Sequence, residues 1–94
     1  MIKIFRIIAL GPLSIESCPE ADVKPYPVRE IRIKEYGKWG SNEFIGTIVL
    51  KDALVDIHEG DLVYAELSFL VCGSKDNPYQ HVSINNLIKL KVTD

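Results

Sequence analysis

Apolar and polar residues alternate along several short segments of this chain, as they do in half-buried β-strands. The clearest alternation runs through residues 28–36, where Ile31 and Ile33 fall on one face. The opposite face carries charged and aromatic side chains: Glu30, Arg32, Lys34 and Tyr36. This pattern predicts a strand with one face in the core and the other in water.

Residues 42–71 form the segment around which the rest of the chain is organised. Residues 43–51 predict one strand, and residues 61–71 predict another with a common apolar face of Val63, Ala65, Leu67 and Phe69. Between them, residues 52–58 predict a single helical turn, with Asp52 as its N-cap and Gly60 as its stop.

The flanking segments predict two further strands. Residues 2–10 form the first, which Gly11 and Pro12 bend and which continues over residues 13–17 beyond a bulge. Residues 79–92 form the last, and Asn85-Asn86 breaks its alternation in the manner of a bulge. The five predicted strands indicate an all-β domain.

Three segments between these strands predict loops or turns. Residues 18–27 hold three prolines and are expected to form a stiff loop. Residues 37–41 predict a glycine-bracketed hairpin loop that carries the only tryptophan, Trp39. Residues 73–78 predict a polar turn.

Five strands without a long helix fit either of two architectures, a five-stranded Greek-key barrel of the OB type or an SH3-like barrel. A long first strand interrupted by glycine, and room for one short helical turn between strands three and four, favour the OB-fold. At 94 residues, the chain is expected to be a single domain spanning residues 1–94.

Composition narrows the function classes. Net charge is −2 with a pI near 5.6, which argues against a strongly basic nucleic-acid binder but leaves room for a local basic stripe.

Cys18 and Cys72 lack metal-ligand spacing, so we expect free thiols in a reducing cytoplasm, with no metal and no cofactor. No apolar run approaches the roughly 20 residues of a membrane span. Scattered carboxylates, no phosphate loop and no nucleophile elbow predict that the chain is not an enzyme.

Two segments carry a resemblance to a known family: Phe44–Leu50 (FIGTIVL) and His58–Glu66 (HEGDLVYAE). The chain resembles the bacterial single-stranded DNA-binding proteins (SSB-like OB-fold family), with Gly60, Val63, Tyr64 and Glu66 at the matching places. Leu67 departs from the family pattern, where a glycine follows. The resemblance implies an OB barrel that binds single-stranded DNA without sequence preference and works as a homo-oligomer.

Binding of single strands needs cations for phosphates and aromatic faces for bases. The candidate residues are Arg32, Lys34, Tyr36, Lys38, Trp39 and Phe44. Phe44 fits either the stacking platform or the core, and the same strand face also fits an ordinary solvated surface. DNA and RNA both remain open as ligands. The alternative function is a protein-interaction barrel that binds no nucleic acid, which the acidic pI favours.

Overall fold

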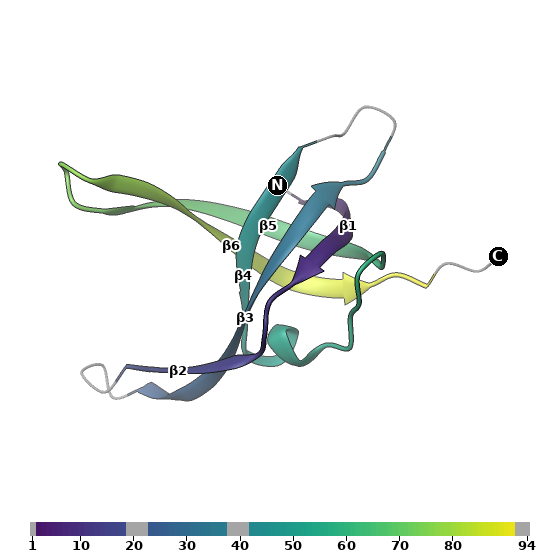
Figure 1. Ribbon diagram of the computed structural model, residues 1–94, viewed down its shortest axis with the longest axis horizontal. Helices are drawn as coiled ribbons and strands as arrows, with labels where there is room; N and C mark the ends of the chain where they lie inside the picture. The colour runs from purple at the N-terminus through teal and green to yellow at the C-terminus, as the bar shows by residue number, and fades with distance from the viewer. Residues whose placement is uncertain (1, 19–22, 38–41, 92–94) are drawn as a thin grey trace.

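The computed structural model describes residues 2–18, 23–37 and 42–91 and consists mainly of β-strands (Figure 1). The elements in chain order are β1 Ile2–Leu10, β2 Ser14–Cys18, β3 Val23–Glu35, β4 Glu43–Val49, the 3-10 turn η2 Leu50–Leu54, β5 Leu62–Gly73 and β6 Pro78–Lys89. In these residues, η2 is the only helical element. The predicted all-β class is therefore confirmed.

Five of the strands pair in a closed ring, in the order β1-β5-β6-β4-β3 and back to β1. All the pairings are antiparallel except that of β4 with β6, which is parallel and has one register pair, Thr47 with Ser83. The sixth strand, β2, pairs only with the first part of β3. The helical turn lies between the third and fourth strands of the ring, as expected.

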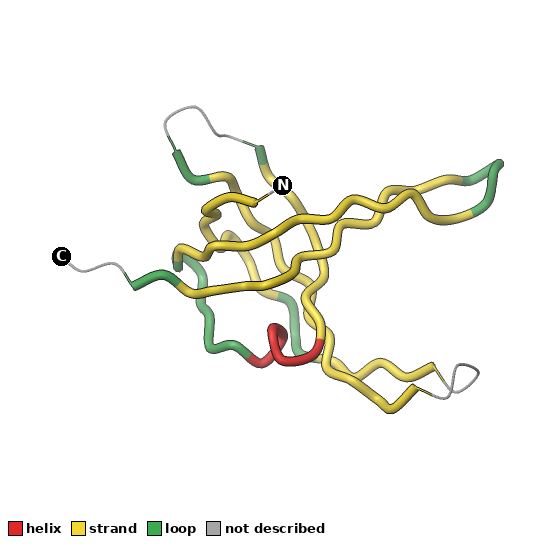
Figure 2. The backbone as a smooth tube through the Cα atoms, turned by 180° about the vertical axis from the view of Figure 1, so that it is seen from behind, coloured by secondary structure: helices red, strands yellow, loops and turns green. Residues whose placement is uncertain are grey.

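β3 is long because it belongs to two structures. From Val28 to Lys34 it pairs with β4, and its last part also pairs with β1. From Val23 to Val28 it pairs with β2 instead. β2 and the first part of β3 form a two-stranded arm, the β2–β3 arm, while the distal parts of β5 and β6 form a second, the β5–β6 arm (Figure 2).

Two sequence-based predictions near the start of the chain are wrong. Within residues 18–27, the described residues, 18 and 23–27, are strand rather than loop, and β3 contains Pro25 and Pro27; residues 19–22 lie outside the described residues. Prolines fit there because this part of β3 pairs on one side only, and an open edge needs no N–H donor. Residues 13–17 do not extend the first strand: β2 is a separate strand, and the register shift in β1 lies between Ile7 and Ala9.

The helical turn begins earlier than predicted. Its N-cap is Val49, without a side-chain capping hydrogen bond, so the predicted N-cap role of Asp52 is wrong. Leu50 takes a left-handed conformation (φ 58°) that turns the chain out of β4 and places Asp52 inside the turn. Gly60, at φ 90°, lies in the tight turn before β5 rather than at the end of η2.

The predicted bulge near Asn85-Asn86 is confirmed. The β5–β6 register passes from Tyr64 opposite Ile88 to Glu66 opposite Asn85, which leaves one extra residue on β6. Asn86 has a positive φ of 54° and donates a hydrogen bond from Nδ2 to Oε2 of Glu66 at 3.1 Å. Asparagine tolerates this left-handed backbone better than most residues.

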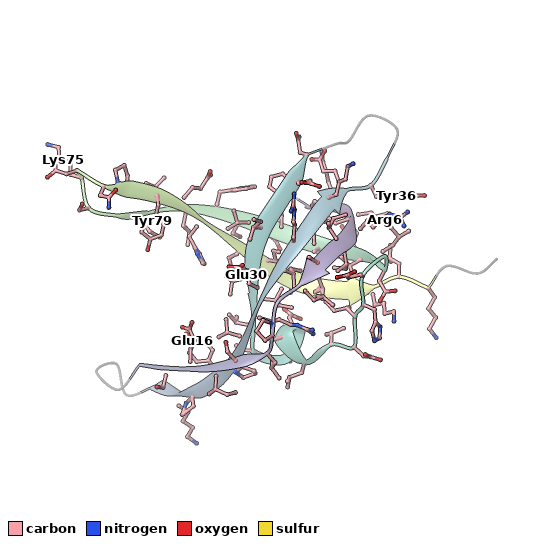
Figure 3. The ribbon with its side chains drawn as sticks, in the orientation of Figure 1. Arg6, Glu16, Glu30, Tyr36, Lys75 and Tyr79 are labelled. Atoms are coloured by element: carbon pink, nitrogen blue, oxygen red, sulfur yellow. The ribbon has the colours of Figure 1, made fainter. Side chains whose placement is uncertain are left out.

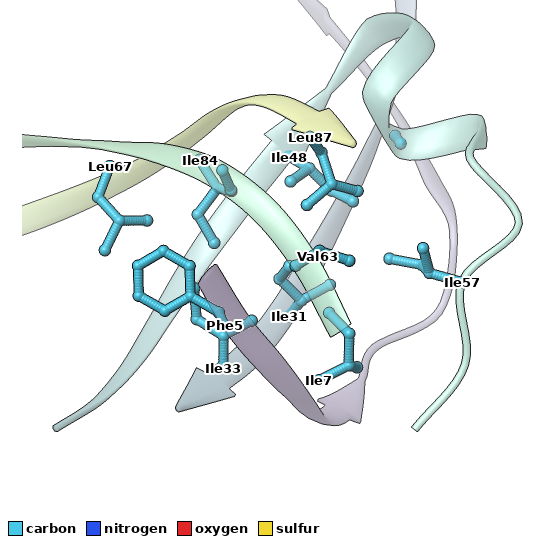
Figure 4. Packing of buried hydrophobic residues seen from close by; sticks show 12 residues of the cluster. Phe5, Ile7, Ile31, Ile33, Ile48, Ile57, Val63, Leu67, Ile84 and Leu87 are labelled. Atoms are coloured by element: carbon cyan, nitrogen blue, oxygen red, sulfur yellow. The ribbon is translucent and has the colours of Figure 1, made fainter. Parts of the chain in front are cut away.

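The core fills the ring with side chains from every strand of it (Figure 4). Phe5, Ile7, Ile31, Ile33, Ile48, Val63, Ala65, Leu67, Ile84 and Leu87 come from the strands, while Ala53 and Ile57 come from the segment between β4 and β5. The predicted inner face of β5 is correct up to Leu67, whereas Phe69 is 39% exposed where β5 enters its arm.

Gly46 lies at the contact between β4 and β6, where the ring closes. A Cβ atom at this position would lie 2.7 Å from Cδ1 and 2.8 Å from Cγ1 of Ile84. Because protein interiors are closely packed, a Cβ atom this close would force Ile84 or the β4 backbone to move. Glycine therefore lets β4 approach β6 over a fully buried isoleucine.

We expect Gly46→Ala to lower the free energy of unfolding by about 1–3 kcal/mol, because overpacking a core costs this much. Thr47→Ala, at the next residue, provides the matched control because Thr47 is not in the buried core. Urea denaturation of both variants measures the difference. Equal stability of Gly46→Ala and the wild type would show that the contact is not tight.

Candidate functional site

The outward side chains of β3 and β4 form one continuous surface, here called the β3–β4 outer face. Its register pairs are Lys34 with Glu43, Arg32 with Ile45, and Glu30 with Thr47. The face exists because Ile31 and Ile33, at the alternate positions of β3, are buried in the ring.

Three of the predicted binding residues lie in this region. Arg32 and Lys34 are exposed on the β3–β4 outer face, and Tyr36 is exposed just beyond the end of β3. Cζ of Arg6 lies 5.7 Å from the centre of the Tyr36 ring, within range of a cation–π contact. Lys38 and Trp39 lie outside the described residues.

Phe44 does not share this surface. It pairs with Ile33, so its side chain lies on the inner face of the sheet, opposite to Arg32 and Lys34. Its ring makes an edge-to-face contact with Phe5, with centroids 6.2 Å apart, and a tilted contact with Phe69 at 5.8 Å. Of the two roles open for Phe44, the structure shows core packing.

The cations of the β3–β4 outer face are balanced by carboxylates. Nη2 of Arg32 donates a hydrogen bond to Oε2 of Glu43 at 2.5 Å. This hydrogen bond, with the charges of Arg32 and Lys34, lowers the pKa of Glu43 below its usual value. Glu30 adds a second negative charge. Within the described part of this face, two cations therefore meet two anions, and Arg32 is already paired.

A shallow hollow adjoins this face where β1 ends. Its volume is about 280 Å³, and it is lined by Ala9, Leu10, Gly11, Glu30, Ile31, Arg32 and Ile45. We call it the β1–β3 hollow. The backbone is fixed around it, since the Gly11 amide donates to the Glu30 carbonyl at 2.8 Å and Nε of Arg29 donates to the Gly11 carbonyl at 2.8 Å.

Sequence reasoning did not identify the hollow. The alternation does place Glu30 and Ile45 outward, but it gives no sign that they meet the end of β1. That meeting depends on the pairing of Leu10 with Ile31 and Ala9 with Arg32 across β1 and β3. The bend at Gly11 was the only local signal, because glycine often marks a close backbone approach.

The two arms extend on either side of the ring strands that carry this face. Figure 3 shows Tyr79 on the β5–β6 arm and Glu16 on the β2–β3 arm, with Glu30 on the ring between them. The β5–β6 arm exposes large apolar side chains, with Leu70 at 55% and Val71 at 81% exposure. An extended ligand on the outer face would thus lie between two projecting hairpins.

The described ranges hold neither a metal-binding cluster nor a membrane-spanning helix. No group of three or more His, Cys, Asp or Glu side chains gathers there as a metal site. None of the helical segments in those ranges is long and apolar enough to cross a membrane.

We expect Arg32→Gln to raise the pKa of Glu43 toward its ordinary value of 4.5, because the main cause of the lowering is removed. In the wild-type protein, the stabilisation from this pair is complete above the unfolded-state pKa. It is lost as the pH falls through the lower folded-state pKa. An NMR titration of the Glu43 carboxyl carbon measures its pKa in the wild-type protein and in the variant. Lys89→Gln, which removes a cation that pairs with Asp61, is the control. An unchanged Glu43 pKa in Arg32→Gln would contradict the pairing.

Comparison with known proteins gives no further identification. No family model, no curated protein and no solved structure matches this chain. Any function must therefore be argued from the ring, its outer face and its arms.

Proposed function

We propose that this chain is an OB-fold domain that binds single-stranded nucleic acid across the β3–β4 outer face. The supporting observation is the ring order. With β1, β3, β4, β5 and β6 counted as ring strands one to five, the parallel contact joins strands three and five, and the helical turn lies between three and four. These are features of the five-stranded Greek-key barrel of the OB type.

The surroundings of the outer face support the same proposal. OB-folds bind oligonucleotides over the face of strands two and three and with the loops after strands one and four. In this chain, that face is the β3–β4 outer face. The connection after ring strand one holds the β2–β3 arm, and the connection after ring strand four is the tip of the β5–β6 arm.

The proposed mechanism is equilibrium binding without turnover. Bases stack on Tyr36 and on Trp39, which follows it by three residues in the chain, while Lys34 and Lys38 attract phosphates. Phe44 has no part in the stacking because it lies on the inner face. Because Glu43 pairs with Arg32, fewer phosphates are neutralised than the sequence suggests. A slope of about −0.7 per phosphate contact is expected in a plot of log affinity against log salt.

The test is a titration of Trp39 fluorescence with oligo-dT at low and high salt. We expect quenching at low salt that reverses at high salt. By anisotropy of a labelled oligonucleotide, Trp39→Ala should weaken binding by at least about 1 kcal/mol, the lower bound for one stacked base. Tyr64→Phe, on β5, is the control and should bind as the wild type does. Absence of binding at low salt would contradict the proposal.

A second candidate function is self-assembly through the β5–β6 arm. Leu70 and Val71 point to opposite sides of this ribbon, and both are exposed, so each side offers an apolar surface. An isolated two-stranded hairpin is marginally stable in water. We infer a second copy as the partner, because a two-fold arrangement lets the same apolar patch on two copies cover each other.

We expect the wild-type protein to form a homo-oligomer whose population rises with concentration, and Val71→Lys to shift it toward the monomer. Sedimentation equilibrium measures this shift. Ile15→Lys, which places the same charge on the other arm, is the matched control and should leave the assembly intact. A wild-type protein that stays monomeric at all concentrations would rule out this candidate.

A further inference from the structure

We propose that the β1–β3 hollow receives one unpaired nucleobase and favours a base that carries an exocyclic amino group, with the Glu30 carboxylate as the acceptor. This inference rests on the proposed function, since it assigns a base preference to the same surface. The hollow opens beside Arg32 and Ile45, so a strand lying along the β3–β4 outer face passes its rim.

The size and walls of the hollow suit a single aromatic ring system. Pockets for drug-sized ligands measure about 300–1,000 Å³, and this hollow of about 280 Å³ lies just below that range. Leu10 and Ile45 supply apolar walls. Ile45, opposite Arg32 on the strand face, is 58% exposed, and a bound base would cover it.

Arg32 is better placed to stack on a base than to neutralise a phosphate. Its hydrogen bond to Glu43 fixes the guanidinium and compensates its charge. A guanidinium keeps its planar faces when its edge is paired, and such planes stack on bases. Arg32 also lines the hollow, so the residue whose pairing weakens phosphate binding can offer a stacking surface there.

Glu30 is the group that can distinguish one base from another. Its side chain makes no hydrogen bond or ion pair with other residues of the described ranges, and it lines the hollow. An ionised carboxylate only accepts hydrogen bonds. It therefore attracts the 4-amino group of cytosine and repels the 4-oxo group of uracil or thymine.

The backbone around Glu30 is fixed before any ligand arrives. Glu30 pairs with Thr47 on β4, and its backbone carbonyl accepts a hydrogen bond from the amide of Gly11 at 2.8 Å. A side chain at position 11 would crowd this contact, because a Cβ there would lie 3.0 Å from the Glu30 carbonyl oxygen. A backbone that is already held in place loses less entropy on binding.

The test compares labelled oligo-dC with oligo-dU by fluorescence anisotropy at mildly alkaline pH, since these two bases differ at the 4-position. We expect the wild-type protein to bind oligo-dC about fivefold more tightly, which corresponds to about 1 kcal/mol, the lower end for one specific base contact. Glu30→Gln should bring the two affinities together, because an amide both donates and accepts. Glu59→Gln removes the same charge from the turn before β5 and should keep the preference.

The outcomes separate the two proposals. Equal binding of oligo-dC and oligo-dU by the wild-type protein would overturn the inference and leave the proposed function standing. A preference that persists in Glu30→Gln would overturn the role of Glu30. Failure of both oligonucleotides to bind at low salt would overturn the proposed function itself.

Discussion

The whole architecture depends on the contact between β4 and β6, which closes the ring with one parallel register pair. Without that contact, the remaining pairings would describe an open sheet with two free edges, and the core residues of β3 and β6 would lose their shared interior. Gly46 and Ile84 make this β4–β6 contact possible, because glycine on β4 has no Cβ atom and so leaves room for the side chain of Ile84 on β6. Closure then gives each ring strand an apolar inside and a polar outside.

The candidate site follows from this division. Strand alternation sends Arg32 and Lys34 outward while Phe44 turns inward to Phe5. Cross-strand register then decides which outward groups meet, and it sets Glu43 against the two cations. The result is a surface with local charges but little net charge, in keeping with the acidic pI of the chain.

The sequence predicts best what depends on near neighbours. Alternation in residues 28–36 locates the buried isoleucines of β3, and Asn85-Asn86 locates the bulge, because both signals are local. Prediction fails where distant strands decide. The prolines of β3 are tolerated only because that segment has an open edge. Likewise, Glu35 is buried and pairs with Lys3. The sequence around Glu35 gives no signal for this pairing, because Lys3 belongs to a different strand.

The three phenylalanines at the root of the β5–β6 arm have a mechanical consequence. Phe69, at the first exposed position of the arm, touches Phe44, and Phe44 touches Phe5 in the core. Any bending of the hairpin below Phe69 has to separate these aromatic rings. The lower part of the arm is therefore attached to β4, the strand that closes the ring, by an aromatic contact in addition to its backbone pairing.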